Sequence, residues 1–124
     1  MSLKILVADD EPNIVISLEY LLKREGYTVV IARDGQEAID AIAREQPDLV
    51  LLDVMMPKKT GFEVCQEVRA HETLQATKIL MLTAKGRDTD LAKGLALGAD
   101  AYMTKPFSTR ELVQKVAQML GRDA

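Results

Sequence analysis

A regular alternation of short aliphatic runs with amphipathic segments constrains this chain most. Aliphatic runs without polar alternation are typical of strands buried on both faces, as in a parallel sheet. The segments between the runs repeat apolar residues at helical spacing, which is typical of helices that cover such a sheet. The expected strands are 4–8, 28–32, 48–52, 78–82 and 101–104, and the expected helices are 13–25, 36–45, 61–70, 88–97 and 109–120. In the last two helices, Leu91, Leu95, Leu112, Val116 and Leu120 are the expected inward positions, and Ser108 is the expected N-cap.

Length and composition exclude several classes of protein. The 124 residues fit a single domain over residues 1–124, and 16 basic residues against 19 acidic ones give a net charge of −3. An acidic balance offers no surface for direct nucleic acid binding, and the apolar runs are too short to span a membrane. With one cysteine and no signal peptide, we expect a reducing, cytoplasmic protein.

Polar residues follow four of the expected strands. In a doubly wound parallel sheet, ligands bind beyond the carboxyl ends of the strands, near the point where the strand order reverses. If these strands are neighbours, their terminal residues converge on one pocket. The residues are Asp9, Asp10 and Glu11 after the first strand, Asp53 after the third, Thr83 after the fourth and Lys105 after the fifth.

This set of residues favours a divalent cation and a phosphoryl group. Clustered carboxylates repel one another unless a cation or proton neutralises them, and hard oxygen ligands without histidine or cysteine suit Mg²⁺. A lysine beside such a cation clamps phosphoryl oxygens, and a carboxylate can be the nucleophile that forms an aspartyl phosphate. Asp53 is the expected acceptor because it lies alone on the central strand, and Asp9 and Asp10 are the expected metal ligands.

Four segments resemble the receiver domain of bacterial two-component response regulators, and the likeness extends over about residues 4–120. Each segment alone is a weak signal, but their order and spacing together are specific. The spacing is 43 residues from Asp10 to Asp53, 30 from Asp53 to Thr83 and 22 from Thr83 to Lys105. The segments are 5–11 (ILVADDE), 51–57 (LLDVMMP), 82–84 (LTA) and 98–107 (GADAYMTKPF).

The resemblance implies a flavodoxin-like α/β fold: a doubly wound five-stranded parallel sheet in the order 2-1-3-4-5, flanked by five helices. It implies a phosphorylation-activated signalling switch rather than an enzyme, with only limited self-catalysed phosphorylation and dephosphorylation. Asp53 would receive the phosphoryl group from the phosphohistidine of a sensor histidine kinase or phosphotransfer protein. The face formed by the fourth helix, fifth strand and fifth helix would then control an output partner or an effector domain outside these residues.

The resemblance also assigns roles to single residues. Mg²⁺ would be bound by Asp10 and Asp53, by Asp9 mostly through water, and by the backbone carbonyl of Met55. The remaining implied roles are phosphoryl binding by Thr83 and Lys105, a switch formed by Thr83 and Tyr102, and a cis peptide bond between Lys105 and Pro106.

Four positions depart from the family pattern or vary within it. Met55 and Lys85 flank the expected phosphorylation site, where an apolar shield and a lysine predict slower hydrolysis than in chemotaxis-type members. Leu91 and Ala101 occupy positions at which winged-helix members carry charges for dimerisation. We therefore expect a partner protein or another interface, and the oligomeric state stays open.

Two alternatives use the same residues. A phosphatase-like enzyme with an aspartyl nucleophile usually has a second acid two residues later, where this chain has Met55. A receiver domain kept only for binding would lack a motif residue, and none is missing.

Taken alone, Thr83 is an ordinary strand-end hydroxyl and Tyr102 an ordinary half-buried aromatic residue. His71 is expected to be a solvated surface residue and not a phosphorelay histidine.

Overall fold

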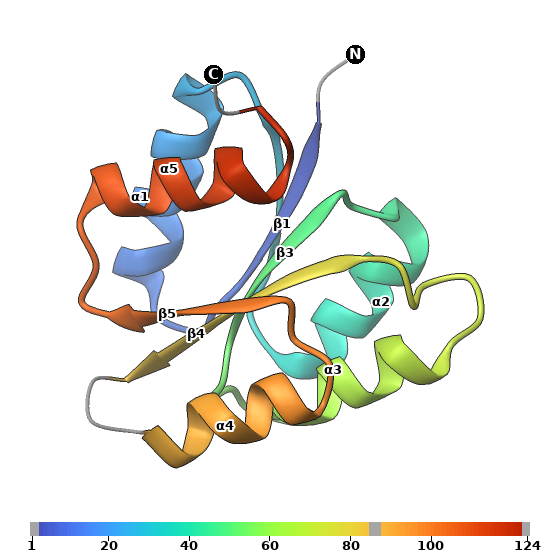
Figure 1. Cartoon of the computed structure of the whole chain (residues 1–124). Helices are drawn as coiled ribbons and strands as arrows, with labels where there is room; N and C mark the ends of the chain where they lie inside the picture. The colour runs from blue at the N-terminus through green and yellow to red at the C-terminus, as the bar shows by residue number, and fades with distance from the viewer. Residues whose placement is uncertain (1–2, 85–87, 123–124) are drawn as a thin grey trace.

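Five parallel strands form one sheet in the order β2-β1-β3-β4-β5, which confirms the expected topology (Figure 1). The structure is a computed structural model that describes residues 3–84 and 88–122. The first two crossovers build the sheet outward in opposite directions from β1, so the reversal of strand order lies between β1 and β3. The strands are β1 (Lys4–Ala8), β2 (Thr28–Ala32), β3 (Leu49–Asp53), β4 (Lys78–Ala84) and β5 (Ala101–Lys105).

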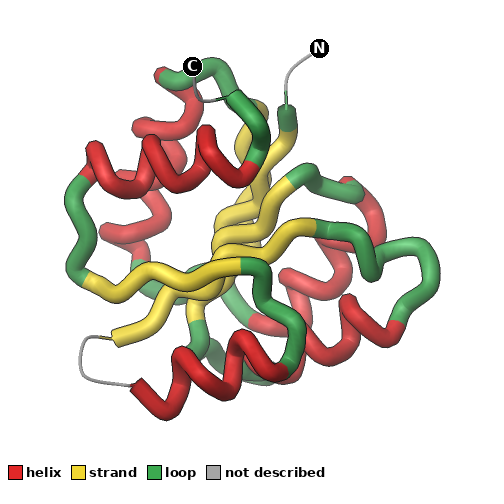
Figure 2. The backbone as a smooth tube through the Cα atoms, in the orientation of Figure 1, coloured by secondary structure: helices red, strands yellow, loops and turns green. Residues whose placement is uncertain are grey.

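Helices alternate with the strands along the chain and cover both faces of the sheet (Figure 2). Two of them, α1 and α5, lie on one face, and the other three lie on the opposite face (Figure 1). Each face therefore has its own apolar core, with the sheet between them. The helices are α1 (Pro12–Arg24), α2 (Gly35–Glu45), α3 (Gly61–Ala70), α4 (Asp88–Ala96) and α5 (Thr109–Met119).

The burial of the strands follows their place in the sheet. All five residues of β3 are buried, because β3 has a strand on either side and helices on both faces. The edge strands β2 and β5 are only partly buried, so the expectation of burial on both faces is wrong for them. Each edge strand has a single neighbour, and the helices above and below cover it incompletely.

Helix termini follow local capping chemistry. The Ser108 hydroxyl accepts a hydrogen bond from the Glu111 N–H at 3.0 Å, which confirms Ser108 as the N-cap of α5. Helix α3 begins with a complete capping box between Thr60 and Glu63. The expectation that Leu95 faces inward is wrong, since its side chain is 45% exposed. Gly94, which packs against Met81, takes the inward position of that turn.

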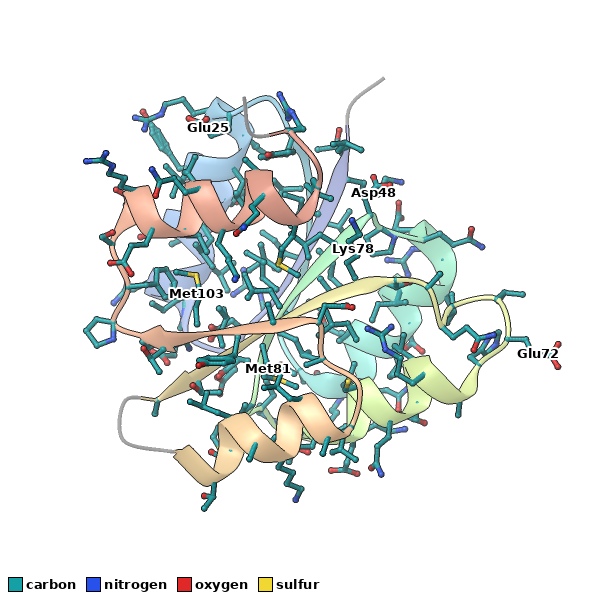
Figure 3. All side chains as sticks on the ribbon, viewed as in Figure 1. Glu25, Asp48, Glu72, Lys78, Met81 and Met103 are labelled. Atoms are coloured by element: carbon teal, nitrogen blue, oxygen red, sulfur yellow. The ribbon has the colours of Figure 1, made fainter. Side chains whose placement is uncertain are left out.

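The strand register brings the carboxyl ends of the central strands to one edge. Asp53 is paired with Leu82, and Thr83 is paired with Thr104 on β5. Met81 and Met103 show the two sides of this edge, because Met81 lies toward α4 and Met103 toward α5 (Figure 3). Within the described ranges, no helix is both long enough and apolar enough to cross a bilayer.

Candidate functional site

Three carboxylates meet where β1 and β3 end. One carboxylate oxygen from each of Asp9, Asp10 and Asp53 lies within 4.8 Å of the others. Asp9 is fully buried and Asp53 is 6% exposed, whereas Asp10 is exposed. The sequence places them correctly because β1 and β3 are neighbours whose parallel strands end together.

The Lys105 ammonium reaches this cluster from the end of β5. Its Nζ lies 2.8 Å from Asp9 Oδ2, 3.2 Å from Glu11 Oε1 and 3.5 Å from Asp53 Oδ1. Burial disfavours the charged ammonium, but the hydrogen bond to Asp9 and the charges of Asp53 and Asp9 outweigh it, so the pKa of Lys105 is raised. Lys105 is therefore a fixed positive charge beside Asp53.

Asp53 is held in an environment that resists its ionisation. Burial and the neighbouring Asp9 and Asp10 charges raise the pKa of Asp53 from 3.8 to about 6, against the opposing effects of Lys105 and of a hydrogen bond from the Met55 backbone. Among the described residues, the three clustered carboxylates outnumber the ammonium of Lys105 that reaches them. A bound cation would relieve this excess.

The donor set fits Mg²⁺. Carboxylate oxygens are the hard ligands that this ion prefers, and they come from two strand ends whose positions the sheet fixes. A pocket of about 330 Å³ opens beside them and is lined by Asp10, Asp53, Met55 and Lys105, among others. Met55 is 62% exposed at the rim of this pocket, so its side chain is not part of the core.

The loop that carries Met55 is held close to the site by two glycines. A Cβ atom on Gly61 would lie 2.4 Å from the backbone oxygen of Asp53, and one on Gly35 would lie 2.1 Å from that of Lys59. Backbone hydrogen bonds from Gly61 to Val54 (2.9 Å) and from Gly35 to Pro57 (3.1 Å) tie the loop at both ends. The chain after Asp53 is therefore anchored to α2 and α3.

Thr83 lies near the carboxyl end of β4, at the same end of the sheet as the carboxylates. Its side chain is fully buried, and its Oγ1 has no hydrogen-bond partner among the described residues. An unpaired buried hydroxyl costs stability, which is unusual unless a ligand pairs with it. Tyr102 lies on β5 and is 43% exposed, and the Lys105–Pro106 peptide bond is cis, as expected.

Two acidic residues of the site were not assigned a role from the sequence. Glu11 was expected in the same pocket as Lys105, but the sequence carries no signal for their direct contact, which joins residues 94 positions apart. Asp90, at the start of α4, is buried and lines the pocket. Lys85, expected to flank the phosphorylation site, lies outside the described residues.

Comparison with known proteins gives a consistent result. A family model described as the response regulator receiver domain matches residues 5–117. The chemotaxis response regulator CheY4 of Vibrio cholerae is 33% identical with a TM-score of 0.91, over 97% of this chain and 100% of that chain. The receiver domain of a histidine kinase from Syntrophus aciditrophicus is 29% identical with a TM-score of 0.90, over 97% and 91%.

A third similar structure contains a metal ion. It is the receiver domain of a sensor histidine kinase from Pseudomonas aeruginosa, described with a magnesium ion coordinated in its active-site cleft. Its sequence is 30% identical to this chain, with a TM-score of 0.89, over 98% of this chain and 99% of that chain.

Proposed function

The chain belongs to the response regulator receiver domain family, and on this premise we propose that Asp53 is its phosphorylation site. Members of this family are phosphoacceptor signalling switches, and this chain is one of them. The observation that carries the assignment is the Lys105 ammonium, 3.5 Å from a buried Asp53 that lies in a cluster of carboxylates. No other carboxylate on the described strands combines burial, a central strand and a pocket beside it.

We propose that Asp9, Asp10, Asp53 and the Met55 carbonyl bind Mg²⁺, with Asp9 acting mostly through water. The similar Pseudomonas aeruginosa domain, described with a magnesium ion coordinated in its active-site cleft, supports the choice of this ion. When bound, the ion supplies positive charge that lowers the repulsion between a carboxylate and the phosphoryl oxygens. The feature of this chain that favours such an ion is the burial of Asp53 beside the charges of Asp9 and Asp10, which together raise the pKa of Asp53.

The remaining residues position and stabilise the transferred group. One Asp53 oxygen forms a bond to phosphorus while the bond from phosphorus to the imidazole nitrogen of the donor phosphohistidine breaks, and that nitrogen keeps the electron pair. Lys105 pairs with a phosphoryl oxygen, and the Thr83 hydroxyl donates to another. The protein thereby promotes its own phosphorylation, and attack by water on phosphorus later returns Asp53 to a free carboxylate.

The surface that communicates phosphorylation to other proteins is formed by α4, β5 and α5. When the Thr83 hydroxyl moves toward the phosphoryl group, the Tyr102 ring turns inward, and the exposed face formed by the three elements changes. A sensor histidine kinase or phosphotransfer protein acts upstream, and an output partner or effector domain acts downstream. We take residues 1–124 as one receiver domain.

A phosphoryl analogue tests this proposal. With Mg²⁺ and beryllofluoride present, the amide NMR resonances of residues around Asp53, Thr83 and Tyr102 are expected to shift. The Asp53→Asn variant lacks the anionic ligand and should show no such shift. If the variant responded like the wild type, Asp53 would not be the acceptor.

A further inference from the structure

The Glu11 side chain is in an unexpected position for a helix N-cap. Glu11 precedes the first residue of α1, but its carboxylate makes no capping hydrogen bond to that helix. It reaches Lys105 instead, with Oε1 at 3.2 Å from Nζ. Its backbone N–H donates to Asp9 Oδ1 at 3.0 Å, which restrains the backbone of Glu11 beside the site.

This contact makes Lys105 a cation shared among three carboxylates. An ammonium has three N–H donors, and here Asp9 and Glu11 accept hydrogen bonds at 2.8 and 3.2 Å. Asp53 lies farther away, at 3.5 Å. Glu11 therefore neutralises part of the Lys105 charge that would otherwise pair with a phosphoryl group on Asp53.

We propose that Glu11 is a positioning residue that restrains Lys105 in the unphosphorylated protein and so weakens anion binding at Asp53. This inference rests on the proposed function, since it concerns the same site. Glu11 acts through Lys105 and not on the phosphoryl group itself. Its side chain is 60% exposed, so the Lys105–Glu11 pair is weaker than the pair with the fully buried Asp9 and is the one that breaks more easily.

The charge of Glu11 has opposite consequences for the two ligands of the site. Removing the Glu11 charge leaves Lys105 freer to pair with an anion. The removal also makes the electrostatic potential that the anion meets less negative. The same removal weakens the attraction for a cation, because one carboxylate fewer faces the pocket. A residue with a purely structural role would weaken both ligands together, and this difference can be measured.

The Glu11→Gln variant isolates the charge, because glutamine preserves the size of the side chain. At saturating Mg²⁺, we expect half-saturation at a beryllofluoride concentration about two- to fivefold lower than for the wild type, the range of exposed ion pairs. Without beryllofluoride, a titration with Mg²⁺ alone should show weaker binding. Amide resonances report both titrations. Glu19→Gln is the matched control, since Glu19 pairs with the neighbouring Lys23 on the surface of α1, and it should change neither affinity.

The outcomes distinguish the role of Glu11 from the proposed function. Unchanged affinities, or a loss of both, in Glu11→Gln would overturn the role of Glu11 while leaving the proposed function intact. A wild type that binds no beryllofluoride would overturn the proposed function itself. Glu11→Ala, measured alongside, should shift both affinities in the same directions as Glu11→Gln, and thermal unfolding of each variant checks that the fold is retained.

Discussion

Thr83 and Tyr102 project from the same face of two neighbouring strands. The β4–β5 register pairs Met81 with Tyr102 and Thr83 with Thr104, and side chains two residues apart on a strand share a face. That face is the one toward α4, on which Met81 lies (Figure 3). Thr83 is fully buried at the site, while Tyr102 is 43% exposed and lies two pairs away in the β4–β5 register. A buried hydroxyl at the site and a ring at the surface are therefore linked by one stretch of sheet.

Replacing Thr83 by Val tests both ends of this link. Because the hydroxyl is buried and has no partner among the described residues, the free energy of unfolding should rise by about 1 kcal/mol without a phosphoryl analogue. The shift of the Tyr102 ring resonances with beryllofluoride should be largely lost. Thr104→Val, at an exposed neighbouring position, is the control for stability. A Thr83→Val protein less stable than the wild type would contradict the unpaired hydroxyl.

Replacing Asp53 by Asn should stabilise the metal-free protein at neutral pH. The folded-state pKa of about 6 lies above the ordinary 3.8, so folded protein retains a proton that the unfolded chain has released. The associated stability is complete below pH 3.8 and is lost as the pH rises through 6. The variant avoids this loss, so its gain should be about 1 to 3 kcal/mol at pH 7.5 and should vanish toward pH 4.

Chemical denaturation with a chelator present, at several pH values, measures this gain. Asp40→Asn is the control, because Asp40 is exposed on α2 and its side chain accepts a hydrogen bond from Gln36 on the same helix. A gain for Asp53→Asn that did not depend on pH would mean that the pKa of Asp53 is not raised.

The sequence predicts the fold well because its strongest signal is local. Continuous aliphatic runs and helical spacing place all ten elements within a few residues of their observed bounds. The exposure of Leu95 could not be predicted, because it depends on which side of α4 the sheet contacts. Gly94, without a side chain, allows Met81 and Phe62 to approach that helix, so the face next to it turns outward.

Asp10 provides a test of the metal site that leaves the acceptor in place. Since Asp10 is exposed and belongs to the carboxylate cluster, Asp10→Asn removes a ligand charge without leaving a buried group unpaired. Mg²⁺ affinity should fall by about tenfold or more, the effect of roughly 1.4 kcal/mol. Calorimetry or amide resonances measure it. Glu72→Gln, in the distant α3–β4 loop (Figure 3), should bind Mg²⁺ like the wild type; equal affinity in Asp10→Asn would remove Asp10 from the ligand set.

Met55 tests the lifetime of the phosphorylated state. Its apolar side chain lines the pocket that contains Asp53, and we propose that it limits the approach of water to an acyl phosphate there. Met55→Asn should therefore shorten the lifetime several fold, as followed by the decay of the phosphorylated mass. Ile16→Asn, an exposed apolar position on α1, controls for the general effect of adding an amide. Decay of the wild type within seconds would contradict the slow hydrolysis that Met55 predicts.

The site was predictable as far as it depends on which polar residues follow each strand. Asp9, Asp53, Thr83 and Lys105 all lie at the expected edge, since a parallel sheet brings these ends together. The contact between Glu11 and Lys105 was not predictable, because it depends on side-chain direction across 94 residues of sequence. Sequence spacing therefore identifies which groups meet at the site, while their pairing becomes visible only in three dimensions.

The most direct test of the account is the location of the phosphoryl group. After incubation with Mg²⁺ and acetyl phosphate, the wild-type protein should gain the mass of one phosphoryl group, and fragmentation should place it on Asp53. Asp53→Asn should gain none, and omission of Mg²⁺ should abolish the gain in the wild type. An equal gain in Asp53→Asn, or a phosphoryl group on another residue of the wild type, would contradict the central claim.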